Sequence, residues 1–227
     1  NDMWPVGYAG VPVGPGDNKA RYPWPPLIDG DRKVAEVRTA ADQDRLTRLY
    51  TERAVRFIEK NKARPFFLYE PQSMPHVPLG VSAEFRGRSK RGPYGDVIME
   101  LDVSVGRILD ALKRAGLDRR TLVVFLSDNG PWLNFGNHAG SAGSLREGKG
   151  TEWEGGVRVP CIMRWPGRIR AGTVCGEMAA SMDILPTVAA AAGARFPRRA
   201  IDGLDLLPLL LGERAASPRE ELYFYYG

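Results

Sequence analysis

The sequence predicts an α/β fold in which a mostly parallel β-sheet is sandwiched between helices. Two observations lead to this expectation. Two short runs of apolar residues, 65–69 and 121–126, are typical of strands that are covered on both faces. A segment with apolar residues at helical spacing precedes each run, and this alternation favours parallel strands joined by right-handed crossovers.

The elements before the second strand follow in order. Residues 1–38 are rich in Pro, Gly and Trp and predict an irregular surface loop. A helix is expected over 40–62, with Thr39 and Asp42 forming its N-terminal cap. A second helix is expected from about Asp96 to Gly116, which is a helix stop signal. The apolar stripe of the first helix consists of Leu46, Leu49, Ala54, Val55 and Ile58, and that of the second of Ile98, Leu101, Val105, Ile108, Leu109 and Leu112.

After the strand at 121–126, three further elements are expected. These are a strand near 157–163, a helix over 183–192 that ends at Gly193, and a last strand over 221–226.

The composition excludes several classes of protein. Of the residues, 43% are hydrophobic and 26% are charged. The sequence contains no run of eighteen apolar residues, so we expect no transmembrane segment. The net charge of +5 suits an anionic substrate. The basic residues at 86–91 lack the interleaved aromatic side chains of a nucleic-acid groove, so we interpret them as a solvated loop and expect no nucleic-acid partner.

Polar side chains follow both predicted strands, where ligands gather in open parallel sheets. Asp128 and Asn129 come after 121–126 and offer two oxygen ligands, which suit Ca²⁺ or Mg²⁺ better than zinc. Calcium takes roughly six to eight oxygens, so this pair is only part of a site. Taken alone, the sequence Asp-Asn-Gly is more simply a turn. His76, in a Pro-rich loop after 65–69, is likewise more often structural when taken alone.

A longer stretch changes this interpretation. Residues 148–160, Gly-Lys-Gly-Thr-Glu-Trp-Glu-Gly-Gly-Val-Arg-Val-Pro, resemble the active-site signature of the type I sulfatases, the arylsulfatase A-like family of the alkaline phosphatase-like superfamily. Further segments resemble this family in the same order along the chain. They are 1–5, 65–69, 75–79, 92–96, 99–102, 122–131, 165–167, 183–187 and 202–206.

The resemblance implies a role for each candidate residue. Asp128 and Asn129 are expected to be two of the side chains that bind Ca²⁺, with Mg²⁺ as the alternative cation. Lys149 is expected to contact a sulfate oxygen, and His76 to contact the sulfate or ester oxygen and to protonate the leaving group. A cation and a lysine stabilise the charge that builds on oxygen as the S–O bond breaks. His138 is a candidate for lining the substrate pocket.

The nucleophile of the family has no counterpart in this sequence. The resemblance implies a formylglycine made from Cys or Ser in a Cys/Ser-x-Pro-x-Arg motif, yet neither Cys161 nor Cys175 is followed by that pattern. The family's N-terminal pair of Asp ligands is also missing. We therefore expect these elements upstream of Asn1, in an N-terminally truncated chain. The isolated 227-residue chain is accordingly expected to be inactive, and turnover of an aryl sulfate by it would contradict this.

The full-length protein is thus expected to be a sulfuric ester hydrolase that acts on a sulfate monoester of an aryl compound, a glycan or a lipid. The resemblance places residues 1–200 in the C-terminal part of the catalytic α/β domain and 201–227 at the start of a small C-terminal α+β domain. Family members are often exported, so we expect a periplasmic, secreted or lysosomal protein.

Two alternative functions remain open at this level. One is a formylglycine-dependent phosphonate or phosphate monoesterase, which would share much of the pattern. The other is a non-catalytic sulfatase homologue that binds sulfated glycans. A two-zinc phosphatase is disfavoured for two reasons. Such enzymes look like they have a histidine directly after the aspartate at the strand end, and this chain has Asn129 there. The second zinc ion would need further histidines, and the chain has only 2 histidines.

Overall fold

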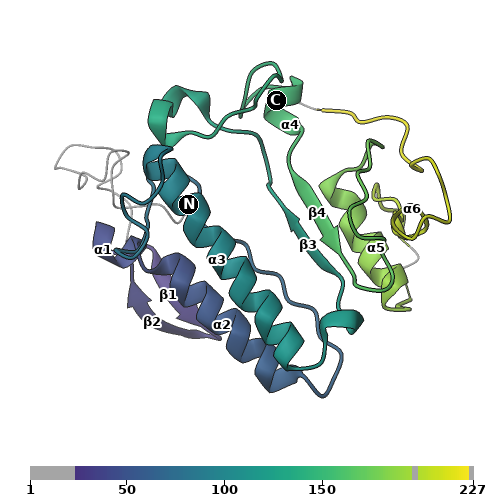
Figure 1. Cartoon of the computed structure of the whole chain (residues 1–227), viewed down its shortest axis with the longest axis horizontal. Helices are drawn as coiled ribbons and strands as arrows, with labels where there is room; N and C mark the ends of the chain where they lie inside the picture. Colours follow the sequence, from purple (N-terminus) through teal and green to yellow (C-terminus); the bar gives the residue numbers. More distant parts are fainter. Residues whose placement is uncertain (1–23, 196–198, 225–227) are drawn as a thin grey trace. The chain divides into compact units, whose positions relative to one another are not determined.

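The computed structural model describes residues 24–195 and 199–224, which divide into two compact units (Figure 1). The first unit comprises the described residues up to 116 together with 131–141, and the second comprises 117–130 and the described residues from 142 onward. The loop expected over 1–23 lies outside the described residues, as do the last residues of the strand expected over 221–226. Residues 221–224 are described and are not in a strand.

The first unit opens with an antiparallel hairpin of β1 (Pro26–Asp29) and β2 (Arg32–Glu36). The turn between them contains Gly30 at a φ of +62°, a conformation that glycine adopts without a steric penalty. The prediction of irregular loop is therefore wrong over 26–36. The signal that could have revealed the hairpin is the Asp-Gly pair between two short apolar runs.

Helices α1 (Ala40–Gln43), α2 (Leu46–Asn61) and α3 (Gly92–Arg114) follow the hairpin. The structure confirms the predicted cap, since the Thr39 side chain accepts the backbone N–H of Asp42 and the Asp42 carboxylate accepts that of Thr39. The helix predicted over 40–62 is interrupted between α1 and α2. α3 begins earlier than expected, because a proline is well tolerated in the first turn of a helix.

Figure 1 shows α2 and α3 side by side. Buried Thr51 on α2 and Ser104 on α3 share a hydrogen bond of 2.6 Å between their hydroxyl groups. Asp96, near the start of α3, is buried and accepts the backbone N–H groups of Gly87 and Ser89, each at 2.7 Å, which fixes the basic loop before the helix. One cluster of the apolar core of this unit consists of Met74, Val81, Phe85, Val97 and Leu101.

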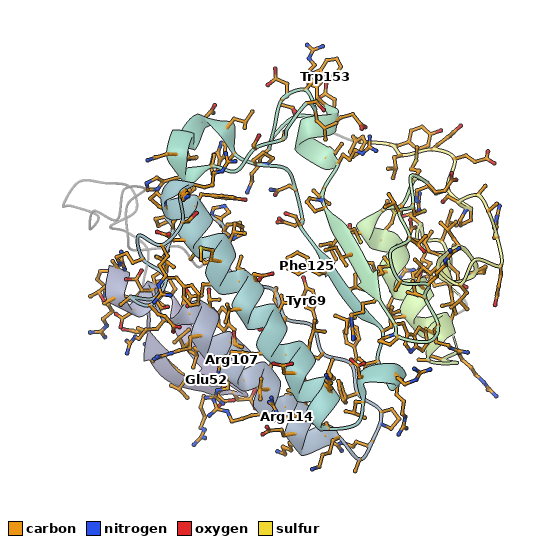
Figure 2. All side chains as sticks on the ribbon, in the orientation of Figure 1. Glu52, Tyr69, Arg107, Arg114, Phe125 and Trp153 are labelled. Atoms are coloured by element: carbon orange, nitrogen blue, oxygen red, sulfur yellow. The ribbon has the colours of Figure 1, made fainter. Side chains whose placement is uncertain are left out.

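The first predicted strand, 65–69, is not a strand in the structure. Phe67 is 71% exposed and Tyr69, which Figure 2 labels, is 76% exposed, so this run is not covered on both faces. The physical reason is that a strand requires a hydrogen-bonded neighbour, and within residues 24–195 and 199–224 none pairs with this segment.

In the second unit, β3 (Val123–Leu126) pairs with β4 (Cys161–Arg164), and the pairing is antiparallel. β3 confirms the predicted strand, but Phe125 is 43% exposed, so the strand is not covered on both faces. β4 starts later than expected, because Val157 ends α4 (Glu154–Val157) and residues 158–160 are not in a strand. The predicted mostly parallel sheet is not present in the part of the chain that the structure describes, which holds two antiparallel pairs.

The second unit ends with α5 (Ile184–Ala191), which confirms the predicted helix, and α6 (Leu207–Leu210). The segment before α6 packs on α5, and the backbone N–H of Leu206 donates to the Thr187 hydroxyl at 2.9 Å. The domain boundary expected at residue 200 stays a prediction. None of the helices in the described residues is both long and apolar enough to cross a membrane.

Candidate functional site

The end of β3 forms a compact turn that presents Asp128 and Asn129. The Ser127 hydroxyl donates to the carbonyl oxygen of Asn129 at 2.9 Å, and the Asn129 side-chain nitrogen donates to the carbonyl oxygen of Gly130 at 2.9 Å. The amide oxygen of Asn129 is therefore the atom left to bind a cation. Asp128 is exposed, and its carboxylate has no hydrogen bond or ion pair within the described residues.

The loop that contains Lys149 packs against this turn through its backbone. The N–H of Gly130 donates to the carbonyl oxygen of Gly156 at 2.9 Å. A side chain at Gly130 would overlap the carbonyl oxygen of Gly155, so the two segments approach as closely as backbones can. The second unit thus brings together the loop of Lys149 and the turn of Asp128 and Asn129.

Adding a methyl group at Gly130 should separate these two segments. We expect Gly130→Ala to lower the free energy of unfolding by about 1–3 kcal/mol, because the new Cβ has no space. The matched control is Gly106→Ala in the exposed part of α3, where an added Cβ meets nothing and the helix should gain up to about 1 kcal/mol. Denaturant unfolding measures both. Equal effects of the two substitutions would contradict the close backbone contact.

The two candidate histidines lie in the first unit. Nδ1 of His76 is 2.6 Å from the carbonyl oxygen of Val77. Because a carbonyl can only accept, Nδ1 carries a proton and Nε2 is the nitrogen available to a substrate. The His76 ring packs edge-on against Trp132, which in turn contacts Phe135. His138 is half-buried and ends the 3₁₀ helix that contains Phe135.

Glu70 is a residue of potential functional interest that the sequence reasoning missed. Burial raises the pKa of its carboxyl to about 7, and the Gln72 side chain donates to it at 2.8 Å. It lies in the loop that leads to His76. A carboxyl that titrates near neutral pH is a feature of many functional sites. No pattern in the sequence marks it, because its raised pKa arises from burial in the folded chain.

The raised pKa of Glu70 predicts a pH dependence of stability. Its folded pKa lies above its unfolded pKa, so the stabilising contribution of the protonated form is lost as pH rises through about 7. We expect Glu70→Gln to gain stability relative to the parent protein between about pH 5 and about pH 8. Thermal unfolding across this range tests it, with Glu59→Gln on the exposed surface of α2 as the control. The same change in stability with pH in both variants would contradict this prediction.

The oxygen chemistry of Asp128 and Asn129 fits a hard divalent cation such as Ca²⁺ or Mg²⁺. Nowhere in residues 24–195 and 199–224 does a group of three or more His, Cys, Asp or Glu side chains form a metal site. A cation at Asp128 and Asn129 would therefore take its remaining ligands from other groups.

Comparisons with known proteins place this chain in a family. The chain matches the sequence model of the Sulfatase family over residues 9–194, and it belongs to that family. It is 50% identical to arylsulfatase A of Homo sapiens over 162 residues, which are 71% of this chain and 32% of that protein. It is 40% identical to N-acetylgalactosamine-6-sulfatase of Mus musculus in an alignment 236 residues long, which covers 100% of this chain and 45% of that protein.

Solved structures agree with this assignment. The PsFucS1 sulfatase from Pseudoalteromonas sp. is 32% identical, with a TM-score of 0.81 over 86% of this chain and 40% of that one. A phosphonate monoester hydrolase from Silicibacter pomeroyi, 20% identical, has a TM-score of 0.62 over 87% of this chain and 47% of that one, and this likeness concerns the fold alone. The fold is alkaline phosphatase-like, and the chain spans less than half the length of these relatives.

Proposed function

We propose that the full-length protein is a sulfuric ester hydrolase that cleaves a sulfate monoester with the help of a divalent cation and a formylglycine nucleophile located outside this chain. The observation that supports this most directly is the backbone contact between Gly130 and Gly156. It holds the oxygen ligands Asp128 and Asn129 against the loop of Lys149, in a chain of the sulfatase family.

Each residue has a role that its chemistry allows. Asp128 and Asn129 hold Ca²⁺, or alternatively Mg²⁺, which supplies positive charge to the sulfate oxygens when bound. Lys149 donates to a sulfate oxygen and stabilises the charge that grows during S–O cleavage. His76, oriented by its Nδ1 hydrogen bond, delivers a proton to the leaving oxygen from Nε2 when the ring is protonated on both nitrogens. His138 lines the substrate pocket.

The substrate class is an aryl, glycan or lipid sulfate, since named relatives include an arylsulfatase, a steryl-sulfatase and an N-acetylgalactosamine-6-sulfatase. Their range is too wide to select one of these. The phosphonate monoester hydrolase shares the fold at 20% identity and does not favour phosphonate as the substrate here. We further propose that the protein is exported.

The test uses the full-length protein and two chromogenic substrates, 4-nitrophenyl sulfate and 4-nitrophenyl phenylphosphonate. We expect faster hydrolysis of the sulfate, loss of activity after treatment with EDTA, and recovery with Ca²⁺ or Mg²⁺. Faster hydrolysis of the phosphonate would identify the alternative esterase. Tight binding of a sulfated glycan without any turnover would instead identify a non-catalytic homologue.

A further inference from the structure

A cation–π contact closes the loop that carries Lys149. The guanidinium carbon of Arg146 lies 3.6 Å from the centroid of the Trp153 ring, well within the range of about 6 Å for such contacts. Arg146 precedes Lys149 by three residues, and Trp153 follows it by four. Trp153, which Figure 2 labels, lies immediately before α4. The two side chains therefore bracket the lysine.

Backbone hydrogen bonds reinforce this bracket. The N–H of Gly155 donates to the carbonyl oxygen of Arg146 at 2.7 Å, and the N–H of Gly156 donates to that of Trp153 at 2.7 Å. Inside the loop, the Thr151 hydroxyl donates to the carbonyl oxygen of Gly148 at 2.9 Å. Residues 146–156 thus form a closed loop, and the carbonyl oxygen of Gly156 also accepts the hydrogen bond from Gly130, in the turn of Asp128 and Asn129.

The backbone beside Lys149 is in a conformation that needs such support. Glu147 has a φ of +63°, in the left-handed region that residues other than glycine rarely adopt. Such a conformation persists where the surrounding structure holds it. The carbonyl oxygens of Arg146 and Glu147 lie so close to Gly155 that a side chain there would overlap both. The contact between Arg146 and Trp153 spans this strained segment.

We propose that Arg146 and Trp153 are positioning residues that fix the backbone of Lys149, so that its ammonium group meets a sulfate oxygen without reorganisation. This inference rests on the role of Lys149 in the proposed function. A lysine side chain is long and flexible, so the position of its charge depends on how firmly its backbone is held. Small displacements of a catalytic group reduce the rate substantially. Arg146 and Trp153 act through the lysine and do not touch the substrate.

The first experiment measures sulfatase kinetics in the full-length protein. Arg146→Met and Trp153→Leu are each expected to lower kcat about 3- to 10-fold with a smaller change in KM. Arg146→Lys and Trp153→Phe, which keep a cation and an aromatic face, should retain most of the activity. The matched control is Arg168→Met, which removes a similar contact with Trp165 (5.0 Å to the ring centroid) elsewhere in the second unit and should leave kcat unchanged.

A second variant set separates positioning from a general structural role. In a Lys149→Ala background, Arg146→Met should cause no further loss of activity, because there is no ammonium group left to position. An additional 3- to 10-fold loss in that background would overturn the proposal.

Hydrogen exchange provides a readout that does not depend on activity. Arg146→Met should speed the exchange of backbone amides within 147–156, and Arg168→Met should not. Unchanged exchange in Arg146→Met would overturn the positioning role while leaving the proposed function in place. Full activity of Lys149→Ala would instead refute the role of Lys149 in the proposed function, and the positioning role with it, even if exchange became faster.

Discussion

Replacing Lys149 by alanine in the full-length protein is expected to lower kcat for a sulfate ester about 100- to 1000-fold, with a smaller change in KM. The substitution removes the positive charge that would stabilise the oxygens of the transferring sulfate group. Loss of one hydrogen-bond donor to a developing negative charge has an effect of this size, because an active site fixes the donor in position before the reaction. A water molecule in its place is not fixed in the same way. Steady-state hydrolysis of 4-nitrophenyl sulfate, with binding of the cation checked separately, measures the change.

Two further variants show whether the effect belongs to this lysine. Lys62→Ala removes an exposed lysine at the end of α2 and should leave kcat unchanged. Lys149→Arg keeps the charge but replaces a compact ammonium group by a planar guanidinium group, so only partial activity is expected. Wild-type kcat in Lys149→Ala would exclude Lys149 from the chemistry, and an equal loss in Lys62→Ala would point to a general effect of charge.

The longer helices α2, α3 and α5 could be predicted from the sequence, whereas the short helices α4 and α6 and the strand pairing could not. The apolar stripes of α2 and α3 are local patterns, and Leu46, Ile58 and Leu101 are buried as those patterns require. Ile98 of the predicted α3 stripe is an exception, since it is 40% exposed. Strand pairing depends on which segments meet in space. The run 65–69 has the composition of a buried strand, but its exposed Phe67 and Tyr69 show that composition does not supply a partner.

The candidate site could likewise be predicted only in part from the sequence. Asp128, Asn129 and Lys149 follow from the resemblance of short motifs, and their oxygen and amine groups suit the chemistry. Their assembly depends on the contact between the backbones around Gly130 and Gly156. This contact requires glycine at Gly130, but the presence of a glycine in the sequence does not show which backbone it contacts. The contact between Arg146 and Trp153 and the raised pKa of Glu70 likewise arise from folding, and the resemblance assigned no role to these three residues.

Asp183→Asn is expected to lower the free energy of unfolding by about 3–5 kcal/mol, the largest loss of stability that we predict. The Asp183 side chain is 0% exposed and accepts the guanidinium group of Arg219, with Nε at 2.9 Å from Oδ2. It also accepts the backbone N–H groups of Ala180 and Leu204, each at 2.8 Å. Neutralising one partner would leave the Arg219 charge uncompensated, and this is more costly than losing an exposed ion pair.

The same group gives the prediction a characteristic pH dependence. Burial alone would raise the pKa of Asp183, but the hydrogen bonds from Arg219 and the two backbone N–H groups outweigh it, so the pKa is lowered. Its stabilising contribution is therefore complete above its unfolded pKa, about 3.9, and is lost as pH falls through the lower folded value. The difference in free energy of unfolding between the parent protein and Asp183→Asn should thus decrease only in strong acid.

An exposed ion pair provides the matched control. Asp29 and Arg53 are 2.6 Å apart in the first unit, with side chains 49% and 50% exposed, so Asp29→Asn should cost less than about 1 kcal/mol. Denaturant unfolding at neutral and acidic pH measures both variants. If Asp183→Asn lowered the free energy of unfolding as little as Asp29→Asn, water would be stabilising the unpaired charge of Arg219, and the prediction would be wrong. Burial of the pair, and not its charge alone, is what makes the two substitutions differ.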